Sequence, residues 1–114
     1  MPRANSSVPR HKRHRKIVKL AKGYYGRRKS NFRAAKDAVE KGLQYSYRDR
    51  RNKKRTMRSL WIIRINAAVR QHGLSYSKFI NLLKEKNIDI NRKSLAYMAV
   101  NDPEGLSAII KSIS

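Results

Sequence analysis

The chain divides sharply by charge at about residue 58. Residues 1–58 contain 21 Lys or Arg and three acidic side chains, a net charge of +18, whereas residues 59–114 have eight basic and four acidic side chains, a net charge of +4. A segment with such a charge repels itself when it is compact. We expect it to be ordered where a polyanion neutralises it, and the usual polyanion is a nucleic-acid backbone.

Apolar residues are also unevenly placed along the chain. They are sparse before Met57 and recur at helical spacing from Leu60 onward. A chain of 114 residues has room for one small domain and an extension, but not for two full cores. We therefore predict a basic extension over residues 1–58 with little core of its own, and a small globular domain over residues 59–114.

The first half of the extension is predicted to contain one helix. Residues 1–9, which include two prolines, are typical of an irregular tail. Residues from about 10 to 22 lack Gly and Pro and favour a helix, for which Gly23 is a suitable C′ residue. Gly23 and Gly26 then allow the backbone to turn, which indicates a break in the chain.

The second half of the extension is predicted to begin a long helix at about residue 31. Ser30 or Asn31 can cap its first turn, and no breaker separates it from Gly73. A helix over residues 31–72 would be about 60 Å long. One side of its first turns is apolar, at spacings of three and four; the residues on this side are Phe32, Ala35, Val39, Leu43 and Tyr47.

The C-terminal half predicts a bundle of short helices that includes the end of the long one. Ser75, Asn91 and Asp102 are suitable N-caps, and Pro103 suits the first turn that follows Asp102. The predicted core comprises Leu60, Trp61, Ile65, Phe79, Ile80, Leu83, Leu95, Met98, Leu106, Ile109 and Ile110. No segment alternates with period two. The predicted fold is therefore all-α, with a long basic helical N-terminal extension followed by a small globular helical bundle.

Charge surrounds the predicted long helix in its middle part. At 100° per residue, Arg48, Arg50, Arg51, Lys53, Lys54, Arg55 and Arg58 cover most of the circumference. A helix that lies on a duplex needs charge on one side, whereas a helix that is charged nearly all round suits a crevice in a folded RNA. The alternative interpretation is a solvated charge run, which the density of charge disfavours.

The candidate RNA-binding residues combine cations with interleaved aromatics. Arginine can bind phosphate bidentately and stack on bases, and tyrosine can stack on unpaired bases. The candidates are Arg3, Arg10, His11, Lys12, Arg13, His14, Arg15, Lys16, Lys19, Lys22, Tyr24, Tyr25, Arg27, Arg28, Lys29, Arg33, Arg48, Arg50, Arg51, Lys53, Lys54, Arg55, Arg58, Arg64, Arg92 and Lys93. Phe32 and Tyr47 can equally shield an apolar seam, and Arg64 can reach either RNA or the chain's own carbonyl groups.

Other classes of function have little support in the sequence. There is no cysteine, and His11 and His14 have no neighbouring carboxylate to complete a metal site. His72 is most simply a partner for a helix dipole, and no arrangement of nucleophile and base is visible. We predict no enzyme, cofactor or metal. No secretory signal or bilayer-spanning apolar run is present, so we expect a soluble intracellular protein.

Several motifs resemble one known family over essentially the whole chain. They are LAKGYYGRRK at residues 20–29, YRDRRNKKR at 47–55, KRTMRSLWIIRINAAVR at 54–70, HGLSYSKFIN at 72–81, and Asn91-Arg92-Lys93 followed by Leu95 and Ala96. Together they resemble the bacterial-type large-subunit (50S) ribosomal protein twenty family. Two positions depart from its pattern: Tyr25 stands where many members have a basic residue, and Gly105 stands where a better helix former is usual.

The resemblance implies a ribosomal role. It implies direct binding to large-subunit (23S-type) rRNA, early action in subunit assembly, neighbouring large-subunit proteins as further partners, and a cytoplasmic place in a bacterial or organellar ribosome. Some members also repress their own messenger. It implies no membrane, cofactor or small-molecule substrate. The alternative from composition is a non-ribosomal nucleic-acid-binding regulator or DNA-compacting protein, and a cationic membrane-active peptide is disfavoured because residues 48–58 lack an apolar face.

Overall fold

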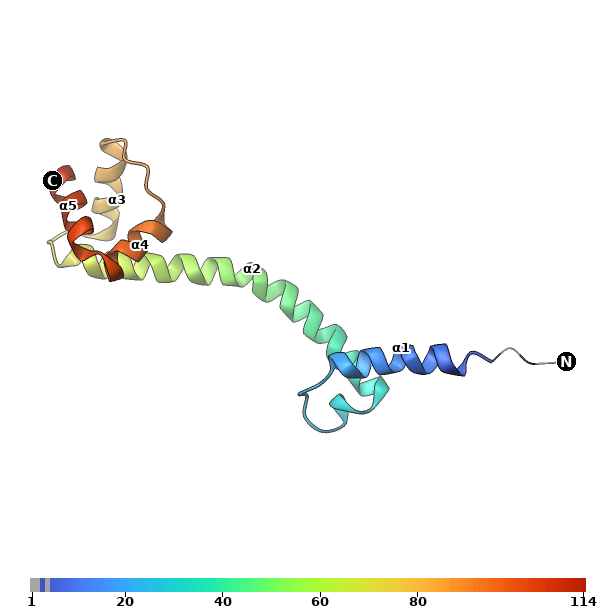
Figure 1. Ribbon diagram of the computed structural model, residues 1–114. Coiled ribbons are helices and arrows are strands. Elements are labelled where there is room, and N and C mark those ends of the chain that lie inside the picture. Colours follow the sequence, from blue (N-terminus) through green and yellow to red (C-terminus); the bar gives the residue numbers. More distant parts are fainter. Residues whose placement is uncertain (1–2, 4) are drawn as a thin grey trace. The chain divides into compact units, whose positions relative to one another are not determined.

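The computed structural model describes residue 3 and residues 5–114, and over this part of the chain all regular structure is helical (Figure 1). The elements are α1 (Ser7–Leu20), the 3-10 helix η1 (Gly26–Lys29), α2 (Phe32–Arg70), α3 (Tyr76–Glu85), α4 (Arg92–Asn101) and α5 (Pro103–Ile113). The predicted all-α class, with a long helix followed by a helical bundle, is confirmed.

Helix α1 begins earlier than its sequence suggests. The predicted tail over residues 1–9 is wrong for Ser7, Val8 and Pro9, which form the first turn of α1. Proline is tolerated there because the first N–H groups of a helix have no intrahelical acceptor. Residues 1, 2 and 4 of the predicted tail lie outside the described residues.

The chain packs as two compact units, Met1–Arg51 and Asn52–Ser114, which we call the N-terminal and C-terminal units. Helix α2 contributes residues to both. This division by packing falls before the division by charge at residue 58, so the most basic part of α2 is shared between the units. The domain boundary at residue 58 stays a prediction.

The N-terminal unit has a small core where α1 ends and α2 begins. Ala21 and Ala35 are fully buried, Val39 is nearly so, and Val18 and Tyr24 pack against them. The first turns of α2 therefore pack on protein, although the sequence predicts little core for this extension. The reason is that the chain folds back after α1 and brings Ala21 against the apolar side of α2.

The apolar side of α2 is covered only in part. Phe32 is half-buried, and its ring stacks on that of His14 with centroids 3.7 Å apart and planes 9° from parallel. Leu43 and Tyr47, which lie on the same predicted side, remain 64% and 58% exposed. No segment of the described N-terminal unit covers them. Phe32 therefore packs inside the N-terminal unit, whereas the ring of Tyr47 is available to a partner.

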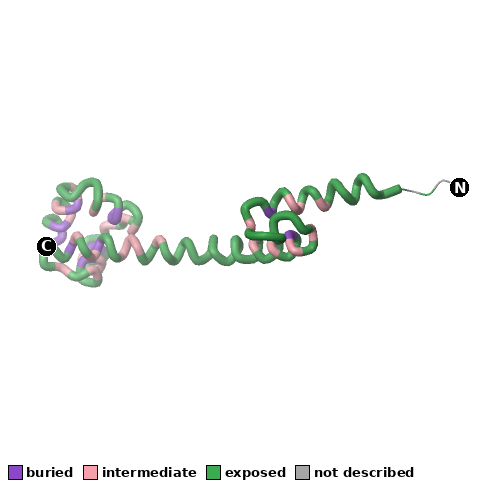
Figure 2. Tube along the Cα trace, turned by 90° about the horizontal axis from the view of Figure 1, so that it is seen from below, coloured by how far each residue is buried: buried purple, intermediate pink, exposed green. Residues whose placement is uncertain are grey.

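The C-terminal unit has a larger core drawn from four helices (Figure 2). Its buried residues are Ile65 and Val69 of α2, Phe79 and Leu83 of α3, Leu95 and Ala96 of α4, and Leu106, Ile110 and Ile113 of α5. Trp61, Ile80, Met98 and Ile109 are half-buried and pack against it. Leu60 is half-buried but lies outside this cluster, because it is about 140° around the helix from Ile65.

Local signals fix the ends of the helices in the C-terminal unit. Ser75, Asn91 and Asp102 each accept a hydrogen bond from a backbone N–H in the first turn of the following helix, as predicted. Gly73 has a φ of +77° and Asn87 a φ of +54°. After each of them an N–H bonds back to the carbonyl of the last turn, which closes α2 and α3 in a Schellman arrangement.

Candidate nucleic-acid interface

The middle of α2 is exposed at every position. Residues 43–56, which we call the exposed stretch, contain no buried or half-buried side chain, and Figure 2 shows them as an unbroken exposed run of helix. A helix without packing contacts is only weakly stable, because most of the stability of protein helices comes from tertiary packing. The exposed stretch therefore has the character of a segment that a partner covers.

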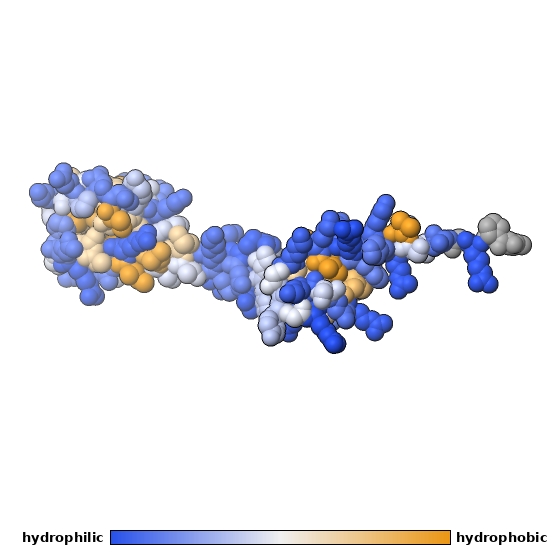
Figure 3. Space-filling view, turned by 60° about the horizontal axis from the view of Figure 1, so that its bottom comes forward, coloured by the Kyte–Doolittle hydropathy of each residue, from blue (hydrophilic) through white to orange (hydrophobic). Residues whose placement is uncertain are grey.

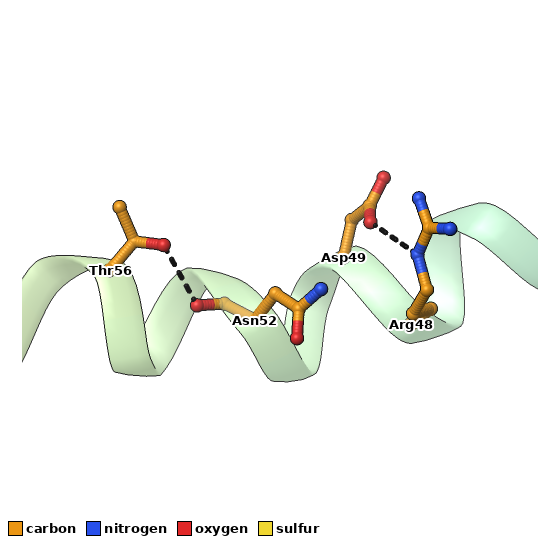
Figure 4. A network of polar contacts seen from close by, with 4 residues as sticks. All are labelled: Arg48, Asp49, Asn52 and Thr56. Carbon is orange, nitrogen blue, oxygen red and sulfur yellow. Dashed lines mark hydrogen bonds and ion pairs between the residues drawn. The ribbon is translucent and has the colours of Figure 1, made fainter.

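Cations dominate the exposed stretch and have few acidic partners. Two ion pairs occur among the described residues: Lys36–Glu40 at 3.9 Å and Arg48–Asp49 at 2.9 Å. Figure 4 shows Arg48 Nε donating to Asp49 Oδ1, and, about two turns further along α2, the Thr56 hydroxyl donating to the Asn52 carbonyl. The bond to Asp49 raises the pKa of Arg48, which stays charged. The remaining cations of the stretch present uncompensated charge in several directions.

Tyrosine rings in and beside the exposed stretch lie under cations. The ring centroid of Tyr45 is 5.1 Å from Lys41 Nζ and 4.6 Å from the Arg48 guanidinium carbon, and that of Tyr47 is 5.2 Å from the guanidinium carbon of Arg51. Such pairs contribute little at exposed sites. They do hold the cations near aromatic faces, which is the combination used to bind single-stranded nucleic acid.

Helix α1 is strongly basic, and one side-chain hydrogen bond, from the Ser7 N–H to Asn5 Oδ1, supports its N-terminus. Ser6, at the N-cap, accepts no capping hydrogen bond, and the first turn contains no acidic residue. Lys12, Arg15, Lys16 and Lys19 line one shallow groove along the helix. Cations near a helix N-terminus oppose the macrodipole, and neighbouring like charges repel. An anionic partner would relieve both effects.

Most of the candidate RNA-binding residues are exposed. They are Arg3, Arg10, His11, Lys12, Arg13, Arg15, Lys16, Lys19, Lys22, Tyr25, Arg27, Arg28, Lys29, Arg33, Arg48, Arg50, Arg51, Lys53, Lys54, Arg55, Arg58, Arg64 and Lys93. His14, Tyr24 and Arg92 are half-buried. Figure 3 shows how strongly hydrophilic side chains surround the few apolar ones on the visible face of α1 and the first half of α2.

The two neighbouring tyrosines differ in their surroundings. Tyr25 is 95% exposed, while Tyr24 packs against the small core of the N-terminal unit. Its hydroxyl lies against α2 at Gly42, where an added Cβ would come within 2.7 Å of it. RNA contact stays a prediction for both residues. For Tyr24, any contact uses a ring that the protein already holds in place.

A groove of about 590 Å³ opens beside Tyr24 within the N-terminal unit. Its lining consists of Tyr24, Arg28, Ala34, Asp37, Ala38, Lys41, Gly42 and Tyr45, and we call it the tyrosine groove. Asp37 and Lys41 were not among the candidate residues. The sequence does indicate Lys41, because it stands four residues before Tyr45 and so lies beside it on a helix. No sequence pattern indicates that residues 24–28 fold back onto α2.

Two predicted residues of the C-terminal unit behave differently. Arg64 is exposed, and none of the hydrogen bonds between described residues uses it, so the alternative of a contact to the chain's own carbonyls has no support. Arg92 instead donates from Nε to the hydroxyl of Tyr76 at 2.8 Å. This bond holds the guanidinium at the start of α4 and leaves its two terminal nitrogens for another acceptor.

Other kinds of site have no structural basis in the described residues. No group of three or more His, Asp or Glu side chains among them could hold a metal ion. His14 stacks on Phe32, and His72 Nε2 lies 3.4 Å from the hydroxyl of Ser107. Over the same residues no helix has the length and apolar content needed to cross a membrane.

Comparison with known proteins gives one consistent result. Residues 3–109 match the family model described as Ribosomal protein L20. The Large ribosomal subunit protein bL20 of Rickettsia prowazekii is 59% identical over 111 residues, which are 97% of this chain and 95% of that protein. The proteins of the same name from Methylorubrum extorquens and Parvibaculum lavamentivorans are 56% and 55% identical over 97% of this chain and 92% and 94% of their own lengths.

Proposed function

Because this chain belongs to the ribosomal protein L20 family and is thus a structural constituent of the large ribosomal subunit, we propose that it binds large-subunit (23S-type) rRNA directly and promotes an early step of subunit assembly. The resemblance drawn from the motifs is thereby confirmed at the level of the family. This is a family of ribosomal structural proteins and not a known enzyme family.

The observation that carries the proposal is the exposed stretch. Fourteen consecutive helical residues, 43–56, have no packing contact that buries them, and six of them are Lys or Arg. Five of these six follow one another between Arg50 and Arg55, interrupted only by Asn52. A partner that surrounds this helix with phosphates would supply the neutralisation that the protein itself lacks.

The mechanism follows from the distribution of charge. Where several RNA helices converge, their phosphates repel one another, and a helix with cations on several sides lowers that repulsion for all of them. Each neutralised phosphate releases condensed counterions, so the affinity has a large salt-dependent part. Recognition is of RNA shape, because the deep groove of an A-form helix does not admit side chains for reading bases.

The C-terminal unit has its own share in the proposed function. Arg64, Arg92 and Lys93 offer cations on a stable helical domain, and the same domain can contact neighbouring large-subunit proteins. We include repression of the protein's own messenger in the proposal, through binding of an RNA that resembles the rRNA site. These partners rest on the family membership and on the position of the exposed cations.

The test is chemical footprinting of large-subunit rRNA with the full chain at near-physiological salt. We expect discrete backbone protections clustered at one multi-helix junction, and weaker competition from duplex DNA than from structured rRNA. Diffuse protection that disappears with a modest increase in salt would overturn the proposal. Preference for duplex DNA would favour a DNA-binding regulator instead.

A matched pair of variants assigns the binding to the exposed stretch. Replacing Arg50 and Arg51 by Gln removes two cations from it, and replacing Lys84 and Lys86 by Gln removes two from the C-terminal unit. We expect the first variant to reduce the slope of log affinity against log salt by about two, and the second to leave it unchanged. Equal effects would show that only total charge matters.

A further inference from the structure

We propose that the tyrosine groove binds one unpaired guanine of the RNA, stacked on Tyr24, with its Watson–Crick edge at Asp37. This proposal rests on the proposed function, since it names a base-specific contact within the same RNA interface. The groove lies wholly within the N-terminal unit and measures about 590 Å³. That size suits one nucleotide and falls in the usual range for small-ligand sites.

The floor of the groove is one face of α2. Ala34, Ala38 and Gly42 follow one another at intervals of four residues, which places them on the same side of the helix. Their small side chains leave depth beside the backbone. Gly42 is required for a specific reason, because a Cβ there would come within 2.7 Å of the Tyr24 hydroxyl.

Tyr24 provides a rigid wall for the groove. Its ring is half-buried and packs against the core of Ala21, Ala35 and Val39, and it also lines the groove. A ring that the core already holds loses little conformational entropy when a base stacks on it. Stacking of a base on an aromatic ring contributes substantially to binding and needs no particular base.

Two cations flank this wall. Arg28 reaches the groove from η1 and Lys41 from α2. An arginine can bind phosphate bidentately, and a lysine acts on it as a point charge. Placed beside one stacked base, they are suited to the phosphates on either side of its nucleotide.

Asp37 gives the groove its selectivity. It makes none of the ion pairs or hydrogen bonds found between described residues, although it lies in an N-terminal unit with a large excess of positive charge. A carboxylate beside phosphates is repulsive unless it accepts hydrogen bonds from the ligand. Guanine presents two adjacent donors, N1–H and the N2 amino group, that match both oxygens of a carboxylate, whereas adenine, cytosine and uracil do not.

The experiment uses kethoxal, a reagent that modifies N1 and N2 of unpaired guanines, on large-subunit rRNA with the full chain. We expect the wild-type protein to protect one guanine that the variant Asp37→Asn leaves reactive, while backbone protections elsewhere persist in both. The matched control is Glu40→Gln, which removes the same charge from a residue that is paired with Lys36 outside the groove.

A second measurement ties the base to the side chain. Replacing the protected guanine by inosine, which lacks the N2 amino group, is expected to weaken wild-type binding by about tenfold and to weaken binding of Asp37→Asn far less. If backbone protections are present but no guanine distinguishes the wild type from Asp37→Asn, the guanine site is wrong and RNA binding stands. If neither bases nor backbone are protected, the proposed function fails as well.

Discussion

The two units of this protein bury very different amounts of apolar surface. The N-terminal unit has three buried side chains, two alanines and a valine. The C-terminal unit has nine, which include Phe79, Ile65 and Leu95. Burial of a large apolar side chain stabilises by about 1.5–3 kcal/mol, and alanine offers far less. The C-terminal unit can therefore hold itself together, whereas the N-terminal unit is close to the limit of stability.

The ends of the helices show the same difference. All three helices that lie wholly in the C-terminal unit begin with a side-chain cap, while Ser6 provides none for α1. Acidic residues are also absent from the first turn of α1, although Glu104 occupies that of α5. In the N-terminal unit, Asn31 Oδ1 accepts from the Arg33 N–H at the start of α2, and Asn5 Oδ1 accepts from the Ser7 N–H at the start of α1. The difference is therefore confined to Ser6 and to the lack of acidic residues in the first turn of α1, which an anionic partner would offset.

The largest expected difference is between a core truncation in the C-terminal unit and one in the N-terminal unit, both measured on the unfolding of the C-terminal unit. Phe79→Ala should destabilise the C-terminal unit by about 3–5 kcal/mol, because it leaves a cavity among four helices. Val39→Ala should leave this unfolding transition unchanged. Urea denaturation followed by the fluorescence of Trp61, the only tryptophan, reports the C-terminal unit alone.

The control for this pair is Ile63→Ala, since Ile63 is exposed on α2; it should shift stability by less than about 0.5 kcal/mol. A Val39→Ala effect on the Trp61 transition as large as that of Phe79→Ala would show that the two units unfold together. The comparison between them would then be wrong.

The next largest difference between the two units is expected in the amide hydrogen exchange of the free protein. We expect the amides of α1 and of the first turns of α2 to open with a free energy below about 2 kcal/mol, because little apolar surface holds them. A unit of the size of the C-terminal one typically has a free energy of unfolding of about 3–9 kcal/mol. Binding of rRNA should raise protection across residues 10–58, and uniform high protection without RNA would contradict this.

The sequence predicts the helices well where the signals are local. Asp102 with Pro103, Asn91, and Gly73 mark their boundaries through capping and backbone preferences that involve only a few neighbours. The core of the C-terminal unit is also visible, since large apolar side chains recur at helical spacing. Leu60 shows the limit, because its place outside the core depends on where the other helices pack.

The fold of the N-terminal unit is much harder to read from the sequence. Its core consists of Ala21, Ala35 and Val39, and alanine favours a helix at any position, so it does not by itself mark a buried face. The contact of Tyr24 with Gly42 joins residues far apart in the chain and leaves no periodic signal. The exposed cations were predictable from charge alone, whereas the tyrosine groove, with Asp37 and Lys41, was not.

A smaller effect is expected from the helix caps. Asp102→Ala removes the acceptor that the N–H of Gly105 uses at 2.9 Å, and should cost about 1 kcal/mol. For a domain of this size that lowers the urea midpoint by about 1 M or less. Ser6→Ala, at a cap that accepts no bond, should leave the exchange of α1 amides unchanged. A loss of α1 protection in Ser6→Ala would show that Ser6 caps α1 in solution.

The smallest expected effect concerns Asp49, the only acidic residue of the exposed stretch. Both side chains of its ion pair with Arg48 are more than half exposed, so Asp49→Asn should not change the urea transition measured at Trp61. It frees one cation and should therefore increase rRNA affinity slightly and steepen the salt dependence by up to about one. Filter binding at several salt concentrations measures both. Weaker binding would mean that Asp49 orients Arg48 for RNA. The exposed stretch would then contain one side chain held in place before binding, although no packing contact fixes the others.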